Sequence, residues 1–577
     1  MSVIIGIDLG TSTTEAAIYR DGKPEMILNM EGEAITPSFI GIDQFGSWVV
    51  GERARAQFLL YPERTAMEVK RKIGTQDMIP LGSQKYNAVT LSAKILEYVK
   101  HYATEKLGEE VTRAVISVPA YFDNQQRQET MQAGRLAGLT VERILNEPTA
   151  AALSYGLDHM EEESHILVYD LGGGTFDVTL LEMFEGVLDV KASSGDNTLG
   201  GKDFDQKLVD KVLGLFSRNF GVDLSADKFA MVKIRDEAEN CKKALSKEDS
   251  YRILIPMITK KGDKPLDIDI TITRKEFEDM TQDLMARTHK PIDTVLADAH
   301  LSASEIDKII LVGGSTRMPM VAKDIEQYLH MQPEEAVNPD LAVAQGAAIQ
   351  AGILAGSIDQ DEGIMITDVN PYTLGIRTVD GFLDFDHMSV VIPRNVTIPS
   401  TRSEVFYTHF DYQTEANVEV YQGESEKASE NRFLGNFLLG GIPPKKAQKE
   451  SILVEFSYDL NGMLNVKATV VSTGNEASID IDMHGHTDGI PEAEGSYSAE
   501  TKKSLEGWKD VEGSEGYRTI IRRMERMLKN AESEEDQMRQ ISLGAMYDAI
   551  REAIVEEDWE RADEVKDSFL RLLEEME

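Results

Sequence analysis

The sequence predicts an α/β domain with two similar lobes, followed by a β-sandwich and a short helical region. Three observations lead to this fold class. A strand–turn–strand unit occurs twice, at residues 3–19 and 166–183, with Asp-Leu-Gly and a threonine in each turn. Apolar strands alternate with helical patterns up to about Ala355, which is typical of α/β layers. Beyond Tyr372 apolar and polar residues alternate at period two, and after Pro491 the chain becomes helical and highly charged.

The second copy of the repeated unit predicts a hairpin. Residues 166–169 are an apolar run of strand-forming residues, and residues 176–180 alternate at period two after the turn. Three consecutive glycines, Gly172 to Gly174, lie between the two strands. Glycine allows positive φ and lets backbone N–H groups approach an anion closely, so this turn is suited to phosphate.

Oxygen-bearing side chains surround the same turn. Asp170 and Asp177 could hold a hydrated Mg²⁺, because this ion prefers hard oxygen ligands and keeps several of its waters. The Thr175 hydroxyl could contact a phosphate oxygen. Isolated glycine-rich turns are often ordinary hairpin turns, so a phosphate site requires a second element that faces the first.

The first copy provides that second element. Residues 3–9 form an apolar strand, Gly10 follows in the turn, and residues 16–19 form the next strand. Two copies of one unit predict two similar lobes whose turns face each other across a cleft, where a nucleoside triphosphate would fit. A third element, residues 309–319, is a buried strand with a Gly-Gly turn that opens a helix. Small residues there allow a flat ring to lie against the backbone, and Arg317 can stack on it.

Bulk composition narrows the classes of partner. The chain has 577 residues and a formal net charge of −40, from 60 basic and 100 acidic residues. Such a field repels nucleic acid and anionic membrane surfaces, so we expect neither as a partner. No apolar run approaches the length of a membrane span and the amino terminus lacks a signal core, so we expect a cytoplasmic protein.

The single cysteine, Cys241, excludes an internal disulfide and fits a reducing compartment. Two lysines follow it directly, and cationic neighbours would lower the pKa of its thiol and favour reaction. Helix geometry allows the opposite interpretation, in which Cys241 faces the core of the lobe and is inert.

Two charged residues of the first part have both a functional and an ordinary interpretation. Residues 91–107 read as an amphipathic helix, and Ala114 to Val118 as a strand. Glu147 then begins another helix, whose first turn contains Pro148, where a missing N–H does no harm. Without the phosphate turns, Glu147 would be a partner of the helix dipole and Lys70 a solvated lysine.

The second part of the chain differs in composition and in the periodicity of its apolar residues. Residues 356–363 are small and acidic and indicate a linker. Residues 417–421, 452–456 and 464–468 alternate strongly, and turns such as Asn461-Gly462 separate such strands, which predicts an antiparallel β-sandwich. Apolar residues at helical spacing near the end predict a small helical appendage.

Seven phrases occur in a fixed order: GIDLGT, VPAYFDNQQRQ, ILNEPTAAALSYGL, YDLGGGTFDVTLLE, LGGKDFD, LVGGSTRMPMV and NPDLAVAQGAA. Together they resemble the DnaK family of heat-shock chaperones, from the first residues to about Ile481 and more loosely over the helical end. The shortened form is similar to the branch called HscC. The resemblance implies an actin-like nucleotide-binding ATPase domain over residues 1–357, an interdomain linker over 358–369, a β-sandwich peptide-binding domain over 370–490 and a helical lid over 491–577.

The resemblance also implies an activity. It predicts an ATP-dependent molecular chaperone that binds and releases extended hydrophobic segments of unfolded proteins, with ATP and Mg²⁺ as cofactors. A J-domain co-chaperone is the expected partner. The need for a nucleotide exchange factor stays open, because the segment between Ile73 and Leu91 is much shorter than in typical members. The same nucleotide motifs occur in sugar kinases and in actin-like filament proteins, but neither alternative explains the linker and the sandwich.

Residue by residue, the resemblance assigns roles in the cleft. Phosphate contacts would come from Gly10, Thr11, Ser12, Gly172, Gly173, Gly174 and Thr175. The hydrated Mg²⁺ would be held by Asp8, Glu147 and Asp170. Adenosine would be held by Glu239, Lys242, Lys243, Gly314, Ser315, Arg317 and Asp340. The catalytic group would be Lys70, Glu147, Thr175 and Asp177, with Lys70 matching the lysine that helps to position the attacking water.

In the sandwich, the matching peptide-binding positions are Ile376, Thr378, Val379, Phe406, His409, Ala416, Val418 and Met463. Alternating apolar residues in a sandwich are usually core, so core packing is the alternative. Ala416 stands where a valine is common and His409 where an alanine is common, which predicts a wider pocket and peptide affinity that changes with pH near ~6.5. Two further departures are Lys202, where an acid is usual, and Thr367, which replaces a leucine and would weaken linker docking.

Overall fold

The computed structural model describes residues 3–576 apart from 158, 160–162, 185, 335–337, 359–364, 381–383, 481–507, 510, 512, 530–542, 544–545, 548–549, 552 and 556. The contacts among these residues divide the chain into two units. The first unit is Met1–Pro371 with Leu460–Gly462, and the second is Tyr372–Asp459 with Met463–Glu577.

The first lobe of the first unit is built on a six-stranded sheet in the order β11-β10-β1-β2-β3, with β4 paired to β2. Its strands are β1 (Ile4–Leu9), β2 (Thr13–Arg20), β3 (Lys23–Met26), β4 (Ile35–Pro37), β10 (Arg113–Val118) and β11 (Thr140–Asn146). Strand β1 is antiparallel to β2 and parallel to β10. The apolar run that forms β1 is buried along most of its length, as expected for a central strand.

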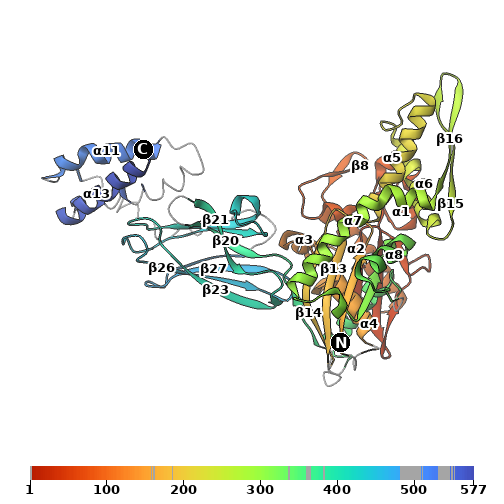
Figure 1. Cartoon of the computed structure of the whole chain (residues 1–577), viewed down its shortest axis with the longest axis horizontal. Helices are drawn as coiled ribbons and strands as arrows, with labels where there is room; N and C mark the ends of the chain where they lie inside the picture. The colour runs from red at the N-terminus through yellow and green to blue at the C-terminus, as the bar shows by residue number, and fades with distance from the viewer. Residues whose placement is uncertain are drawn as a thin grey trace. The chain divides into compact units, whose positions relative to one another are not determined.

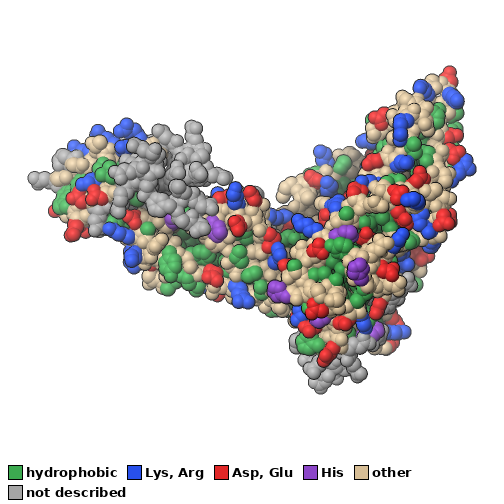
Figure 2. Space-filling view, in the orientation of Figure 1, with side chains coloured by type: hydrophobic (Ala, Val, Ile, Leu, Met, Phe, Trp, Pro, Cys, Tyr) green, Lys and Arg blue, Asp and Glu red, His purple; other side chains and the backbone are tan. Residues whose placement is uncertain are grey.

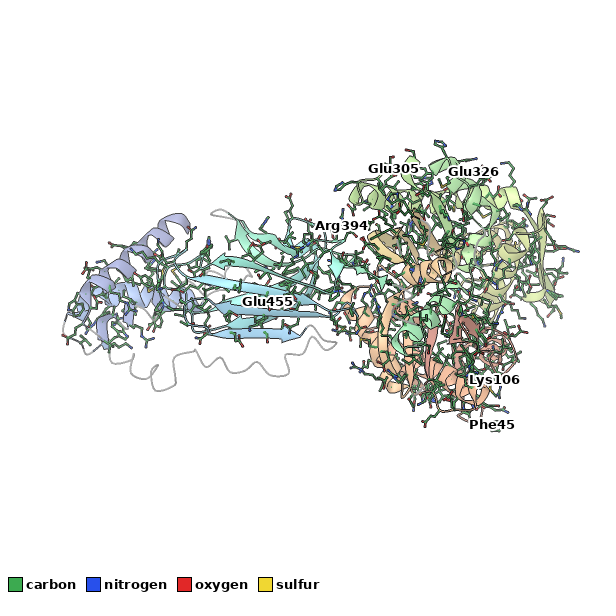
Figure 3. The ribbon with its side chains drawn as sticks, turned by 90° about the horizontal axis from the view of Figure 1, so that it is seen from below. Phe45, Lys106, Glu305, Glu326, Arg394 and Glu455 are labelled. Atoms are coloured by element: carbon green, nitrogen blue, oxygen red, sulfur yellow. The ribbon has the colours of Figure 1, made fainter. Side chains whose placement is uncertain are left out.

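The second lobe repeats this arrangement in a five-stranded sheet, in the order β17-β12-β13-β14-β18. Its strands are β12 (Ser164–Leu171), β13 (Phe176–Phe184), β14 (Val187–Asp196), β17 (Lys308–Val312) and β18 (Met365–Ile366). Strand β12 is antiparallel to β13 and parallel to β17, as β1 is to β2 and β10. The predicted hairpin and the predicted internal repeat are therefore confirmed. Figure 3 labels Phe45 and Lys106 on the first lobe and Glu305 and Glu326 on the second, on opposite sides of the unit.

Helices cover both sheets of the first unit. They are α1 (Glu52–Phe58), α2 (Ala88–Leu107), α3 (Asn124–Leu136), α4 (Glu147–Gly156), α5 (Gly201–Phe220), α6 (Lys228–Leu245), α7 (Arg274–Asp298), α8 (Pro319–Leu329) and α9 (Ala342–Leu354). Helix α2 starts at Ala88 rather than at the predicted Leu91, because the Asn87 side chain accepts a hydrogen bond from the backbone N–H of Thr90 and caps the helix there.

Helices α4 and α9 pack closely because their contact surfaces carry small residues. A Cβ on Gly346 of α9 would lie 1.7 Å from the carbonyl oxygen of Ala150 in α4. Only glycine allows two backbones to approach in this way. The same core contains residues of β1, β12 and β17, so α4 is held firmly against both sheets. This packing fixes the position of Glu147, the first residue of α4.

Smaller elements complete the first unit. They are β5 (Ile40–Ile42), β6 (Trp48–Val50), β7 (Thr65–Ala66), β8 (Ile79–Leu81), β9 (Gln84–Tyr86), β15 (Ser250–Lys261), β16 (Lys264–Thr273) and β19 (Asp368–Val369), with short 3₁₀ turns at Pro62–Arg64, Val69–Lys72, Ala303–Glu305 and Gly314–Arg317. The long β15–β16 hairpin runs beside α5 and α6 in Figure 1 and packs on α6. The segment between Ile73 and Leu91 contains the two-stranded β8–β9 hairpin.

The second unit contains two four-stranded antiparallel sheets, in the orders β21-β20-β24-β25 and β23-β26-β27-β28. The strands of this unit are β20 (Leu374–Asp380), β21 (Asp384–Ile392), β22 (Thr397–Ile398), β23 (Ser400–Tyr407), β24 (Ala416–Gln422), β25 (Arg432–Leu439), β26 (Ser451–Tyr458), β27 (Leu464–Val470) and β28 (Glu476–Asp480). Strand β27 alternates strictly between buried and half-buried residues. The buried residues of both sheets form one core, which is the packing expected of alternating strands.

Helices α11 (Arg518–Lys529) and α13 (Trp559–Met576) belong to the same unit. Their core contains Ile521, Met524, Val565 and Phe569, and Tyr412 from the loop after β23 packs into it. Among the described residues, no helix is long and apolar enough to cross a membrane. Acidic and basic side chains are interspersed over the face shown in Figure 2.

Candidate functional site

The glycine-rich turns of the two lobes lie against each other. A Cβ on Gly173 would lie 2.2 Å from the Oγ of Ser12, and a Cβ on Gly174 would lie 2.8 Å from the Cγ2 of Thr11. Both separations are shorter than ordinary contacts, so a larger residue at either position would displace the side chain of Ser12 or Thr11. The prediction that the two turns face each other is confirmed.

The turns line a cleft that contains about 1760 Å³ of empty space, including its open mouth. The predicted residues that line it are Asp8, Gly10, Thr11, Ser12, Lys70, Glu147, Asp170, Gly172, Gly173, Thr175, Glu239, Lys242, Lys243, Gly314, Ser315, Arg317 and Asp340. Gly174 and Asp177 do not line it, although they adjoin residues that do. The fold thus gathers almost the whole predicted set, while the role of each residue stays a prediction.

Three carboxyl groups meet where the central strands end or begin, of which Asp170 and Asp177 are buried and Asp8 is half-buried. Burial, together with the nearby carboxylate of Glu147, raises the pKa of Asp8 to about 6 and that of Asp177 to about 7. The same two causes raise the pKa of Asp170 well above its usual range. Buried carboxyl groups that are costly to ionise alone are stabilised by a cation.

A hydrated Mg²⁺ could supply the hydrogen bond that one of these carboxyl groups, Asp177, lacks. Asp177 accepts a hydrogen bond from the backbone N–H of Tyr121 at 3.0 Å through Oδ1, whereas its Oδ2 has no hydrogen-bond partner among the described residues. Asp8 accepts from the Ser117 hydroxyl at 2.7 Å. Within the described part of the chain, no group of three or more acidic, histidine or cysteine side chains could ligate a metal directly. Ligation through water, which Mg²⁺ favours, agrees with both findings.

Lys70 points into the same part of the cleft. It lies in the 3₁₀ turn Val69–Lys72 and is only 5% exposed. Its Nζ donates to Oε1 of Glu147 at 2.5 Å and lies 5.6 Å from the centre of the Phe122 ring. The interpretation of Lys70 as a solvated lysine is therefore wrong.

The far end of the cleft is formed by α6 and the turn Gly314–Arg317. Nη2 of Arg317 lies 2.6 Å from Oδ2 of Asp340, and Nζ of Lys243 lies 2.7 Å from Oε1 of Glu239. The ion pairs restrict the rotamers of long side chains that would otherwise be mobile. The arrangement leaves a polar, ordered lining around a space that a flat ring can enter.

Lys202 also lines this end of the cleft, although it was predicted only as a departure from the family pattern. Its Nζ lies 3.3 Å from Oε2 of Glu239 and 3.9 Å from Oδ2 of Asp205. Burial lowers the pKa of Lys202, but the two acids outweigh burial and raise it. Burial conversely raises the pKa of Glu239, but Lys202 and the adjacent lysines hold it well below its usual range.

Further residues of the lining were not predicted as site residues, and Thr13, Glu15 and Lys247 are among them. Glu15 had a signal in the sequence, because it is a charged residue directly before the apolar run of residues 16–18 in one predicted strand. The strand assignment alone could not tell whether it faces the cleft.

Cys241 lies in the core of the second lobe with no exposed surface. Burial raises the pKa of its thiol to about 12, so the two neighbouring lysines do not create a thiolate. The interpretation of Cys241 as a reactive thiol is therefore wrong, and its interpretation as a core residue is confirmed.

The predicted peptide-binding positions divide into two groups. Ile376 and Val418 are each 5% exposed and belong to the core shared by both sheets. The others are half-buried, namely Thr378, Val379, Phe406, His409, Ala416 and Met463. Core packing, the alternative for this set, therefore describes Ile376 and Val418, and the half-buried Phe406 and Ala416 also pack against the same core.

The linker residue Thr367 is anchored on the second lobe. Its backbone N–H donates to the carbonyl of Leu188 at 3.0 Å, and its hydroxyl accepts from the N–H of Val190 at 3.1 Å and donates to Asp189 at 2.5 Å. These hydrogen bonds offset the apolar contact that a leucine would provide, so the structure does not bear out the expected weak docking at this residue.

Two lobes with repeated topology, facing glycine turns and a lysine-carboxylate pair in the cleft define a two-lobed ATPase domain of the α/β class. Residues 4–80 and 75–576 match the family model described as Hsp70 protein. The chain belongs to the Hsp70 family. Members of this family are ATPases and chaperones that bind ATP with Mg²⁺, unfolded clients and J-domain co-chaperones.

Proposed function

We propose that this chain is an ATP-dependent chaperone that binds and releases extended apolar segments of unfolded proteins as it hydrolyses ATP. The observation that carries the proposal is the pairing of Lys70 with Glu147 at 2.5 Å, beside the facing glycine turns. Phosphoryl transfer to water requires positioning and charge stabilisation rather than a covalent intermediate. A bound Mg²⁺ would supply charge neutralisation at the phosphates.

The residues of the chain would divide this work. Backbone N–H groups of the two turns bind the phosphates, and Thr175 contacts a phosphate oxygen. Asp8, Glu147 and Asp170 hold the waters of the ion. Lys70 keeps its ammonium group near the γ-phosphate, where the carboxylate of Glu147 holds it in one orientation and the attacking water is positioned.

The proposed peptide site lies where β20 and β24 part. The two strands pair only through Leu374–Ile376 and Val420–Gln422, although β20 continues to Asp380 and β24 begins at Ala416. Thr378 and Val379 on one strand, and Ala416 on the other, therefore lie beyond the shared ladder. An extended peptide that adds backbone hydrogen bonds there would satisfy groups that β20 and β24 do not satisfy in each other.

The linker supports coupling between the two activities. The carboxylate of Asp368 is buried and accepts from Nδ2 of Asn146 at 2.7 Å, while Oδ1 of Asn146 accepts from Arg127 at 2.6 Å. Asn146 immediately precedes Glu147, the partner of Lys70. A movement of the linker would therefore be transmitted to the hydrolytic site through the adjacent residues Asn146 and Glu147.

The proposal also covers the branch of the family, the partner protein, the cellular compartment and the domain boundaries. The short segment between Ile73 and Leu91 supports the HscC-type branch, and a J-domain protein is the expected partner. The single cysteine agrees with a reducing compartment, and we assign the protein to the cytoplasm. The domain boundaries proposed are residues 1–357, 358–369, 370–490 and 491–577.

Steady-state ATP turnover tests the proposal against its two alternatives. A chaperone of this type hydrolyses ATP faster when an unfolded apolar peptide is added. A sugar kinase responds to a panel of hexoses and pentoses instead, and a filament-forming ATPase sediments in the presence of ATP. Stimulation by peptide alone supports the proposal, and stimulation by sugar or ATP-dependent sedimentation without a peptide effect overturns it.

A further inference from the structure

Glu15 is a buried carboxyl group that the proposed mechanism does not use. It lies within β2, lines the nucleotide cleft and is 1% exposed. Its Oε1 has no hydrogen-bond partner among the described residues. A buried carboxyl oxygen without a partner is unfavourable and calls for a ligand that supplies the missing interaction.

The sheet register brings Glu15 next to a residue of the magnesium site. Asp8 of β1 and Glu15 of β2 are direct partners in the antiparallel ladder. Side chains of directly opposite residues lie on one face of a sheet, with Cβ atoms about 4.5–5.5 Å apart. The two carboxyl groups therefore share one face of the sheet at the floor of the cleft.

The charge balance of this floor points to a cation. Five carboxyl groups gather there, from Asp8, Glu15, Glu147, Asp170 and Asp177. Lys70 forms an ion pair with one of them, Glu147. Arg127 is close enough to lower the pKa of Asp177, so two cationic side chains face five carboxyl groups, and the carboxyl groups outnumber the cations before any nucleotide enters. A nucleotide alone would worsen it, because its phosphates are negative as well.

We propose that Glu15 is an additional, water-mediated ligand that enables the cleft to hold a hydrated divalent cation beside Asp8 before the nucleotide binds. The proposal deepens and rests on the magnesium site of the proposed function. The absence, among described residues, of three side chains placed for direct ligation requires that waters of the ion bridge to the carboxylates. Glu15 accepts from such a water through the oxygen that has no other partner, and Asp8 accepts from a neighbouring water of the same ion.

Manganese binding to the nucleotide-free full chain tests this inference without any measure of hydrolysis. Free Mn²⁺ is measured by its electron paramagnetic resonance signal for the wild type, Glu15→Gln and a matched control, Glu25→Gln. Glu25 lies on the adjacent strand β3 in an exposed ion pair with Lys23. We expect one tight Mn²⁺ in the wild type and the control, and at least ~10-fold weaker binding in Glu15→Gln.

A second variant keeps the test decisive if Glu15→Gln folds poorly. Glu15→Leu removes the unpartnered oxygen, so we expect its thermal midpoint without cation to equal or exceed that of the wild type. Added Mg²⁺ should raise the midpoint of the wild type and not that of Glu15→Leu. Equal Mn²⁺ affinity in the wild type and Glu15→Gln, or no Mn²⁺ binding by the nucleotide-free wild type, would overturn the proposal.

Nucleotide binding separates this failure from a failure of the proposed function. Fluorescent ADP is titrated into the same variants with saturating Mg²⁺. If the wild type binds ADP but binds no Mn²⁺ in the absence of nucleotide, only the proposed role of Glu15 is overturned. Loss of ADP binding by the wild type overturns the nucleotide site itself.

Discussion

Lys70 and Glu147 form a buried ion pair in which Nζ and Oε1 are 2.5 Å apart, although 77 residues separate them in the chain. Their side chains are 5% and 11% exposed. Removal of one partner from such a pair leaves an uncompensated buried charge, so each residue fixes the other. Because α4 is packed firmly, Glu147 is the fixed member and Lys70 is held toward the phosphate turns.

Substitution of this lysine should separate hydrolysis from binding. We expect Lys70→Ala to reduce the single-turnover hydrolysis rate constant by ~100-fold or more, since one preorganised charge at a transition state contributes on this order. The dissociation constant for ADP should change little. The matched control is Lys72→Ala. Lys72 lies in the same turn as Lys70, but its side chain is exposed and pairs with Asp77. A hydrolysis rate constant that is equal in Lys70→Ala and the wild type would contradict the assigned role.

A charge reversal at Lys202 should weaken nucleotide binding. Lys202→Glu would bring a third carboxylate beside Glu239 and Asp205, which now lie 3.3 Å and 3.9 Å from the ammonium group. We expect ADP affinity measured by isothermal calorimetry to fall by ~10-fold or more, about 1.4 kcal/mol. Lys207→Glu is the control, because Lys207 lies on the same helix as Lys202, does not line the cleft and pairs with the exposed Asp283 of α7. Identical affinities in the two variants would show that Lys202 has no influence on the nucleotide.

The size of residue 416 should set peptide preference. Ala416 is half-buried at the start of β24, where β20 no longer pairs with it. Ala416→Val adds two methyl groups, so we expect peptides with a central aromatic residue to bind about tenfold more weakly while small aliphatic ones keep their affinity. Ala477→Val, on β28 of the opposite sheet, controls for a general effect on the shared core. Peptide arrays that rank the ligands identically before and after Ala416→Val would rule out this pocket.

Burial lowers the pKa of His409 from its ordinary value of 6.5, so the histidine is neutral at pH 7. A pKa that is lower in the folded protein than in the unfolded chain favours the neutral form. The stabilisation of the folded protein that comes from the neutral imidazole is therefore complete above about pH 6.5. It is lost as the pH falls from there through the pKa of His409 in the folded protein. A peptide that covers His409 would desolvate the imidazole further and so favour its neutral form, so we expect peptide affinity also to fall as the pH decreases below about 6.5. Fluorescence titration of a peptide between pH 7.5 and 5 should show the decline in the wild type and not in His409→Gln, and a decline of equal size in both would exclude His409 as its cause.

The repeated strand–turn–strand unit made most of the nucleotide site predictable. Gly10 and Gly172 follow matching strands of two different sheets, so two similar lobes that pack together present their corresponding turns to each other. The start of α2 was three residues off because a cap, Asn87, decided it rather than the apolar period.

Other features depended on information that a sequence does not carry. Glu15 faces Asp8 only through the register of β1 and β2, and Lys202 reaches Glu239 only through the packing of α5 beside α6. Cys241 is inert because of the direction in which its helix faces. The early end of the β20–β24 ladder likewise follows from how the two strands diverge, which alternation alone cannot show.

Peptide release triggered by nucleotide tests whether ATP binding and peptide binding are coupled in this chain. A fluorescent extended apolar peptide is bound to the full chain, and its dissociation is followed by stopped-flow after mixing with excess unlabelled peptide and either Mg-ATP or Mg-ADP. The chaperone proposed here should release the peptide at least ~10-fold faster with Mg-ATP, because coupling requires a difference in affinity between two states. Asp368→Asn, which removes the buried charge of the linker, should reduce this acceleration while leaving release with Mg-ADP unchanged. Equal release rates with the two nucleotides in the wild type would contradict the account.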